Sequence, residues 1–235
     1  MGPDYHLKAA GRASDFFLEA AEDLRYLLGK SYPRPGALTF VGNRYQLPKD
    51  EREILGRGVY PGAEALARRH KMVGPATIKG RAMGVDGHNV LITVESGILG
   101  RDLIECDDGV IRDAAWVSNS YRPSAATDQA LAMILEFLAE CRALSIVFFL
   151  YAPMGLSGEL AARIRTALSA RGLLGRAEAV PVPANELRSF PGLVATSNSV
   201  LIDRVTEPID LAGHVIRRFW PEVPFTGLGL HQSEI

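Results

Sequence analysis

Apolar residues recur in two different rhythms along this chain. In residues 14–72 they recur every three or four positions, as Phe17, Ala20, Leu24 and Leu28 do, which is typical of amphipathic helices. We expect helices over residues 14–29, 36–41, 48–56 and 61–72, because prolines and glycines break the pattern between them. This part of the chain therefore predicts a small all-helical module.

Beyond residue 80, short apolar runs alternate with helical patterns. The expected strands are 82–85, 102–106, 145–150, 177–182 and 193–196, and the expected helices are 127–142, 158–170, 184–189 and 211–220. This alternation predicts βαβ units, and so an α/β fold with a mostly parallel sheet covered by helices on both faces. Residues 73–80 are rich in glycine and proline and form a linker. We therefore divide the chain into a helical module at 1–75 and an α/β domain at 80–235.

The composition indicates an ordinary globular protein of a reducing compartment. Of 235 residues, 47% are hydrophobic and 23% are charged, and two cysteines are too few for a disulfide framework. The longest apolar runs are of strand length, and the first residues lack the pattern of a signal peptide. We expect a cytoplasmic protein that does not enter a membrane.

The net charge of −1 hides an asymmetry between the two parts. Residues 1–79 carry 13 Lys and Arg against 9 Asp and Glu, whereas residues 80–235 carry 13 Arg, no Lys and 18 Asp and Glu. A basic module suits an anchor for a polyanion, with Arg44, Arg57, Arg68 and Arg69 as candidates. Alternatively, the asymmetry is a chance difference of a few charges, and the last two arginines complement a helix dipole.

A carboxylate and an amide follow the first expected strand. Val85 ends the apolar run, and Asp86, Gly87, His88 and Asn89 come next. Ligands of α/β sheets bind at the carboxyl ends of strands, so Asp86 is the central candidate, with Asn89 beside it. Alternatively, Asp86 caps the following helix. We interpret His88 as a packing or surface histidine rather than a ligand.

Three more carboxylates lie close together in the sequence. Asp107 and Asp108 follow the expected strand at 102–106, and Asp113 stands beside Arg112. Such a cluster is costly unless water, arginine or a cation neutralises it. Together with Asp86, these side chains predict a site for Mg²⁺ or Mn²⁺.

Hydroxyl groups follow two other strands. Ser157 opens the helix at 158–170, where it either caps the helix or helps its backbone N–H groups bind a phosphate. Ser197 and Asn198 follow the strand at 193–196 and either cap a short helix or orient phosphate and water. The chain lacks Gly-x-Gly-x-x-Gly, the Walker pattern and a Gly-x-Ser-x-Gly elbow, which argues against dinucleotide, P-loop and serine-hydrolase enzymes.

At these motifs the chain resembles PIN-like nucleases, particularly the NYN-type branch. There a strand ends in Asp-Gly-Tyr-Asn or a close variant, as at residues 86–89, and a late strand runs into Thr-Ser-Asp, as at 196–198. Over residues 20–215 the chain is more closely similar to an uncharacterised prokaryotic family that pairs a small helical module with such a domain. The stretches that carry this likeness are 23–28, 41–47, 86–89, 107–113, 157–161 and 194–199.

The resemblance implies a PIN-like sheet and a metal-dependent ribonuclease-type site with Asp86 as the central ligand. The cluster at 107–113 would supply further carboxylates. Asn198 departs from the pattern because Asp is usual there, and Tyr151 stands where an acidic residue is expected. Two missing charges weaken metal binding, so the resemblance also allows a slow or silent member.

Three functions follow from these observations. The first is a metal-dependent nuclease acting on RNA rather than DNA, with the following residues at its site: Asp86, Asp107, Asp108 and Asp113 as ligands of Mg²⁺ or Mn²⁺, and Asn89, Ser197 and Asn198 as groups that orient water or phosphate. The second is a catalytically silent RNA-binding or assembly protein. The third is a small-molecule phosphohydrolase. The tail after Trp220 either packs on the body or reaches a second copy in a homodimer.

Overall fold

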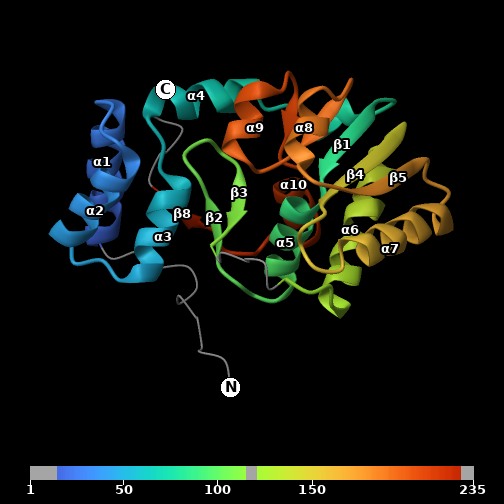
Figure 1. Cartoon of the computed structure of the whole chain (residues 1–235). Helices are drawn as coiled ribbons and strands as arrows, with labels where there is room; N and C mark the ends of the chain where they lie inside the picture. The colour runs from blue at the N-terminus through green and yellow to red at the C-terminus, as the bar shows by residue number, and fades with distance from the viewer. Residues whose placement is uncertain (1–14, 115–120, 229–235) are drawn as a thin grey trace. The chain divides into compact units, whose positions relative to one another are not determined.

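The computed structural model describes residues 15–114 and 121–228, and the chain divides into two units (Figure 1). Unit 1 comprises Met1–His70, Arg101–Ala115 and Pro224–Ile235, and unit 2 comprises Lys71–Gly100 and Trp116–Val223. The first boundary lies just before the linker expected at 73–80. Unit 1 also takes up two later segments that the sequence pattern assigned to the α/β domain at 80–235.

Unit 1 contains four helices and a small sheet among its described residues. They are α1 (Asp15–Gly29), α2 (Arg34–Arg44), α3 (Lys49–Gly58), α4 (Gly62–Lys71, whose last residue belongs to unit 2), β2 (Leu103–Glu105), β3 (Ile111–Asp113) and β8 (Thr226–Gly227). Strand β2 pairs antiparallel with β3 and parallel with β8. The four expected helices are therefore confirmed, whereas the strand expected at 102–106 belongs to this small sheet.

The apolar stripes of these helices explain why the sheet joins them. Leu24, Leu55 and Ile104 are fully buried in one hydrophobic cluster, which also includes Leu228. Gly58 lies so close to β2 and to Leu228 that a Cβ added there would collide with a Leu228 methyl group. Removing this apolar surface from water stabilises the helices together with the small sheet.

Unit 2 is built on a five-stranded parallel sheet, which confirms the predicted α/β fold. The strands are β1 (Ala82–Asp86), β4 (Ser145–Tyr151), β5 (Gly175–Val180), β6 (Leu193–Ala195) and β7 (Pro208–Ile209), in the order β5-β4-β1-β6-β7. Every pair in this sheet is parallel. Strand β4 reads Ser-Ile-Val-Phe-Phe-Leu-Tyr without polar alternation, because a parallel strand covered on both faces needs apolar residues throughout.

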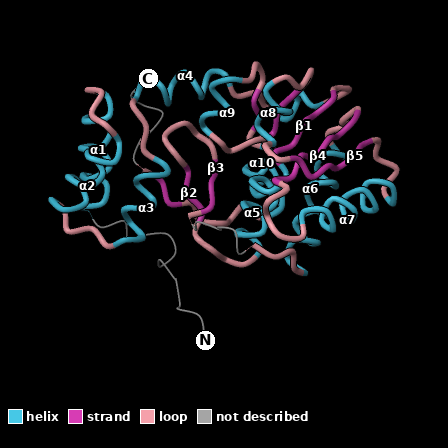
Figure 2. Tube along the Cα trace, in the orientation of Figure 1, coloured by secondary structure: helices cyan, strands magenta, loops and turns pink. Residues whose placement is uncertain are grey.

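Helices cover both faces of this sheet (Figures 1 and 2). The helices of unit 2 are α5 (Gly87–Ile98), α6 (Ala125–Glu140), α7 (Ser157–Ala170), α8 (Pro183–Arg188), α9 (Ser199–Arg204) and α10 (Leu211–Phe219), and a short 3₁₀ helix, η1 (Pro75–Ile78), precedes β1. Helices α8 and α9 pack with Val147, Phe149 and Val194 on one face. Helices α5, α6, α7 and α10 lie together on the other. The expected helices at 127–142, 158–170, 184–189 and 211–220 correspond to α6, α7, α8 and α10.

Side-chain caps fix where two of these helices begin. Ser124 accepts a hydrogen bond from the Ala126 N–H, and Thr127 accepts one from the Ser124 N–H, so a reciprocal pair starts α6. Asp210 accepts from the Gly213 N–H at 2.9 Å and starts α10. Among the described residues, no helix combines the length and the apolar character needed to cross a bilayer.

Substitution of Gly84 tests how closely Leu187 of α8 and Phe190 pack on the central strand β1. A Cβ there would lie 2.9 Å from both Leu187 and Phe190, so we expect Gly84→Val to lower the free energy of unfolding by about 1–3 kcal/mol. A Cβ at Gly158 would have no neighbour within 4 Å in the described part of the chain, so Gly158→Ala should be neutral or stabilising by up to about 1 kcal/mol. Urea unfolding of both variants measures the difference, and equal stability would contradict the close packing.

Candidate functional site

The strand order places one position of unit 2 at a change of direction. The chain runs from β1 to β4 and β5 on one side, then returns past β1 to β6 and β7 on the other. In parallel sheets, ligands bind outside the carboxyl ends of the strands where the order reverses in this way. The carboxyl ends of β1 and β6 meet at that position, so their last residues form the candidate site.

Asp86 ends β1 at this position, and its carboxylate is held by side chains. The Thr196 hydroxyl donates to Asp86 Oδ2 at 3.0 Å, and the Asn89 amide donates to the same oxygen at 2.5 Å. The Asp86 side chain does not cap α5, which answers the alternative that the sequence left open. Asp86 is only 8% exposed. Burial raises its pKa, and the hydrogen bonds from Asn89 and Thr196 oppose that rise.

The turn after β6 is tied to this carboxylate. Thr196 Oγ1 accepts from the Asn198 N–H at 3.1 Å while it donates to Asp86. Asn198 Oδ1 in turn accepts from the Leu201 N–H at 3.1 Å and caps α9. Ser197 lies between them and is partly exposed. Thr196 is the contact that sequence reasoning missed as a site residue, although its place at the end of a strand, before two predicted residues, was the available signal.

His88 lies on the first turn of α5 and faces the neighbouring strand end. Its Nδ1 accepts from the Tyr151 N–H at 3.0 Å, so the neutral ring carries its proton on Nε2. Among the residues that the structure describes, that buried nitrogen has no hydrogen-bond partner, and the ring packs edge to face against Tyr121 with centroids 5.8 Å apart. Burial lowers the pKa of His88 to about 4. The packing interpretation of His88 agrees with these contacts.

Ser157 uses its hydroxyl to close the loop after β4. The hydroxyl donates to the Tyr151 carbonyl at 2.7 Å and also to the Met154 carbonyl. The N-cap position of α7 is occupied by Leu156 in a left-handed conformation, with φ of 65°. The Ser157 hydroxyl already donates its proton to carbonyl groups of the chain. The predicted phosphate contact of Ser157 therefore depends on the position of this residue at the start of α7 and not on its hydroxyl.

The carboxylates predicted from residues 107–113 are all paired with arginines within unit 1. Asp107 receives two bonds from Arg25, each of 2.9 Å. Asp108 receives two bonds of 2.8 Å from Arg112. Asp113 faces Arg57 at 3.3 Å, and burial raises its pKa although Arg57 opposes the rise. Of the alternatives left open for this cluster, pairing with arginine is the one that these contacts support.

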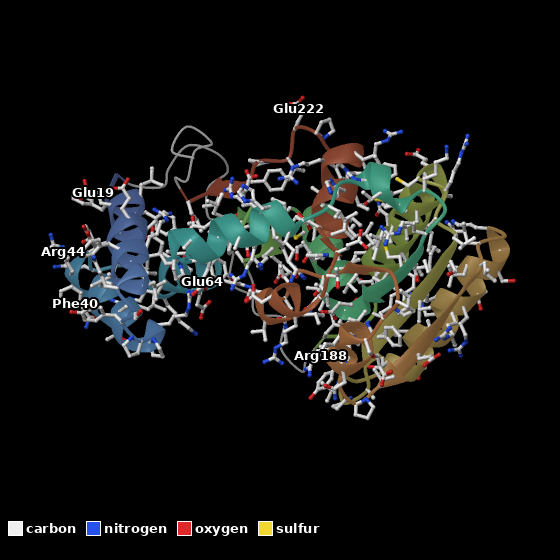
Figure 3. The ribbon with its side chains drawn as sticks, turned by 90° about the horizontal axis from the view of Figure 1, so that it is seen from above. Glu19, Phe40, Arg44, Glu64, Arg188 and Glu222 are labelled. Atoms are coloured by element: carbon white, nitrogen blue, oxygen red, sulfur yellow. The ribbon has the colours of Figure 1, made fainter. Side chains whose placement is uncertain are left out.

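The four arginines proposed to bind a polyanion have different environments. Arg57 pairs with Asp113, as described above, and Arg68 is buried 3.7 Å from Asp108. Arg69 donates to the Asp107 carbonyl at 2.7 Å. Arg44 projects from α2, with 60% of its side chain exposed and a contact of 3.4 Å to Asp23 (Figure 3). The partly buried arginines therefore organise unit 1, and Arg44 is the most exposed of the four.

The donors at the candidate site decide which metal ions they could hold. Within residues 15–114 and 121–228, no three His, Cys, Asp or Glu side chains lie close enough to hold an ion. The Asn89 side chain directs its NH₂ group, and not its oxygen, at Asp86. The side-chain oxygen of Asn198 accepts the hydrogen bond that caps α9. Mg²⁺ often binds one or two carboxylates and keeps several waters. This donor set offers a single carboxylate, which does not suit a pair of ions.

A change at Asp108 distinguishes a structural role of this carboxylate from a role as a metal ligand. Asp108→Asn leaves Arg112 buried without its counter-charge, so we expect a loss of about 3–5 kcal/mol in the free energy of unfolding, with or without Mg²⁺. The double variant with Arg112→Met should lose less than the sum of the two single variants. Urea unfolding measures both. Additive losses, or a stability that depends on Mg²⁺ only in the wild type, would contradict the ion pair.

The buried imidazole of His88 predicts a dependence of stability on pH. Because folding lowers its pKa from 6.5 to about 4, the unfolded chain takes up a proton first as the pH falls. The contribution of the neutral His88 ring to the free energy of unfolding is complete above the pKa of the unfolded chain. It is lost as the pH falls toward the pKa of the folded protein. We expect His88→Asn, whose Oδ1 can still accept from the Tyr151 N–H, to lose about 2–3 kcal/mol less than the wild type between pH 7 and 4.5. Equal losses in unfolding experiments would contradict the buried neutral ring.

Comparisons with known proteins match two successive segments of the chain. Residues 16–71 match the family model "Protein of unknown function (DUF434)", and residues 75–214 match "Domain of unknown function (DUF5616)". The chain is 33% identical over 200 residues to "Uncharacterized protein MJ0935" of Methanocaldococcus jannaschii, covering 84% of this chain and 95% of that protein. No solved structure matches the chain significantly. The resemblance to a prokaryotic family of unknown function is thereby confirmed, and the chain belongs to the DUF5616 family, with a DUF434 segment ahead of that domain.

Proposed function

We propose that this protein is a metal-dependent, nuclease-like protein that acts on RNA phosphodiesters at the carboxyl end of β1. The observation that carries the proposal is the setting of Asp86. It is a carboxylate at the point of a parallel sheet where the strand order reverses. Thr196 and Asn89 donate hydrogen bonds to it, and it does not cap α5. The choice of RNA rests on the resemblance of residues 86–89 to the NYN-type motif.

The donor set limits the proposal to one cation. Asp86 would hold a single Mg²⁺ or Mn²⁺, and when bound such an ion neutralises phosphate charge and lowers the pKa of a coordinated water. Thr196 and Asn89 fix the orientation of the carboxylate, and Thr196 also ties it to the turn that carries Ser197 and Asn198. A phosphate or its attacking water would approach that turn. The proposal does not require the arginine-paired carboxylates of unit 1.

A second candidate function is RNA binding without turnover. Tyr151 ends β4 and Asn198 follows β6, so both neighbouring strand ends carry neutral residues beside Asp86. A single carboxylate attracts a divalent ion weakly, because fewer negative ligands compensate for the water that the ion gives up. This arrangement favours weak metal binding, and with it a protein that retains the RNA contacts but turns over slowly or not at all.

The Asp86→Asn variant tests the first candidate on a labelled single-stranded RNA with Mg²⁺ or Mn²⁺. The change keeps the shape of the side chain and removes its charge, so we expect cleavage to slow by about 100-fold, the scale of losing one electrostatic group from an active site. Asp128→Asn is the matched control, because Asp128 is an exposed carboxylate on α6 that pairs with Arg163, and its cleavage rate should be that of the wild type.

Each other outcome has a defined meaning. Equal cleavage by wild type and Asp86→Asn contradicts a role for Asp86 in turnover. Metal-independent RNA binding without product supports the silent protein. Hydrolysis of a nucleotide or sugar phosphate, with RNA left intact, supports the small-molecule phosphohydrolase instead.

A further inference from the structure

We propose that Arg122 is a phosphate-binding residue at the carboxyl end of β4, the strand next to the one that carries Asp86, and that Glu95, Tyr121 and Thr127 are the residues that position it. The inference rests on the proposed function, because the anion it would bind is a phosphate of the same RNA. Neither Arg122 nor its positioning residues belonged to the site that the sequence predicted.

A buried carboxylate fixes the segment that leads to Arg122. Glu95 lies on α5 and is only 5% exposed. The Thr127 hydroxyl donates to Glu95 Oε2 at 2.6 Å, and the Tyr121 hydroxyl donates to the same oxygen at 3.1 Å. Buried carboxylates need such donors, because removing a charge from water is costly without hydrogen bonds. These bonds therefore hold Tyr121 against α5.

The Tyr121 ring adds a second point of attachment. It packs edge to face against His88, whose Nδ1 accepts from the Tyr151 N–H at the end of β4. Tyr121 is thus fixed at its hydroxyl by Glu95 and at its ring by His88. The backbone at residue 121 has little freedom, so the position of the next residue, Arg122, is set by contacts that are buried.

The Arg122 side chain lies over the loop that follows β4. Its Nη1 donates to the Tyr121 carbonyl at 2.9 Å. A Cβ added to Gly155 would be 2.9 Å from the same nitrogen, so the guanidinium packs directly on the Gly155 backbone. Gly155 belongs to the connection between β4 and α7, and that connection starts at the carboxyl end of the sheet. Strand β4 pairs with β1, so the connection on which the guanidinium packs starts at the strand end next to the one that carries Asp86.

A positive charge has a chemical purpose at this place. A phosphodiester that approaches Asp86 meets a carboxylate of the same sign, and a single ion offsets that repulsion only in part. Arg122 is exposed, and a guanidinium presents several N–H donors in one plane, which suits two oxygens of a phosphate. Because the group is already held by its neighbours, binding would cost little side-chain entropy.

Binding of a short single-stranded RNA in EDTA, measured over a range of KCl concentrations, tests this proposal. Each phosphate neutralised on a single strand contributes about 0.7 to the slope of log K against log salt. Arg122→Gln should reduce that slope by about 0.7 and weaken binding by about fivefold near 0.1 M salt. Arg122→Lys should keep the slope. Arg171→Gln is the matched control, because it removes an exposed arginine at the opposite end of α7.

The positioning residues are tested by the same slope, which a purely structural role would leave unchanged. Thr127→Val removes the donor to Glu95 and keeps the shape of the side chain, and Gly155→Ala displaces the guanidinium. Both should reduce the slope in the presence of Arg122 and have no further effect in the Arg122→Gln background. Circular dichroism and urea unfolding confirm that each variant is folded before its binding is compared.

The outcomes separate this inference from the proposed function. A slope in Arg122→Gln equal to that of Arg171→Gln overturns the inference, and Asp86→Asn can still abolish metal-dependent cleavage in that case. Failure of Asp86→Asn to affect cleavage, with a reduced slope in Arg122→Gln, overturns the proposed catalysis and leaves Arg122 as an RNA contact. A wild type that binds no RNA overturns both.

Discussion

The pairing of β1 with β4 on one side and β6 on the other is the constraint on which unit 2 depends. A central strand covered on both faces admits only small or apolar residues, and β1 keeps to that rule until its last position. The register aligns Val85 with Ala195, so the residues that follow, Asp86 and Thr196, come side by side. The sheet itself therefore supplies the carboxylate with its hydroxyl donor.

Carboxylates of the same type have opposite surroundings in the two units. Asp86 is buried among neutral donors, and burial raises its pKa. In unit 1, Asp107 and Asp108 are buried against Arg25 and Arg112, so their charges are balanced within the chain. Pairing of this kind offsets the cost of taking a charge out of water. An acidic run in the sequence thus indicates where negative charge must be balanced. The contacts in the structure decide whether a cation or an arginine balances it.

The Tyr60 ring shows how far the arginines are used to build unit 1. The guanidinium carbons of Arg34, Arg68 and Arg112 lie 5.1, 4.5 and 5.5 Å from its centre. The backbone N–H of Tyr60 donates to Asp107 Oδ2 at 3.0 Å. Cations over an aromatic ring gain from its quadrupole, more so where water is excluded. Two of the basic residues in 1–79, Arg34 and Arg68, are used in these contacts, and the predicted role of the arginines in binding a polyanion stays a prediction.

Local patterns were sufficient for the parallel sheet and insufficient for the contacts between distant residues. The runs at 82–85, 145–150, 177–182 and 193–196 correspond to β1, β4, β5 and β6, because buried parallel strands are continuous apolar runs. The run at 102–106 has the same signature but pairs in the small sheet, since a pattern identifies a strand and not its partner. Strand β7 has two residues, too few for any periodicity. Arg25 and Asp107 are 82 positions apart, so nothing local could pair them, whereas pairing of the carboxylate cluster with Arg112 was an alternative already left open by the sequence.

The small sheet of unit 1 also has a consequence for how the chain is made. Strand β8 and Leu228 complete the surroundings of β2, yet the ribosome adds them only after all of unit 2 has been synthesised. Helices α1 to α4 emerge first, with part of their apolar surface still waiting for segments that follow by tens or hundreds of residues. The DUF434 segment on its own would therefore leave that surface exposed to water until β2 and β8 have been made.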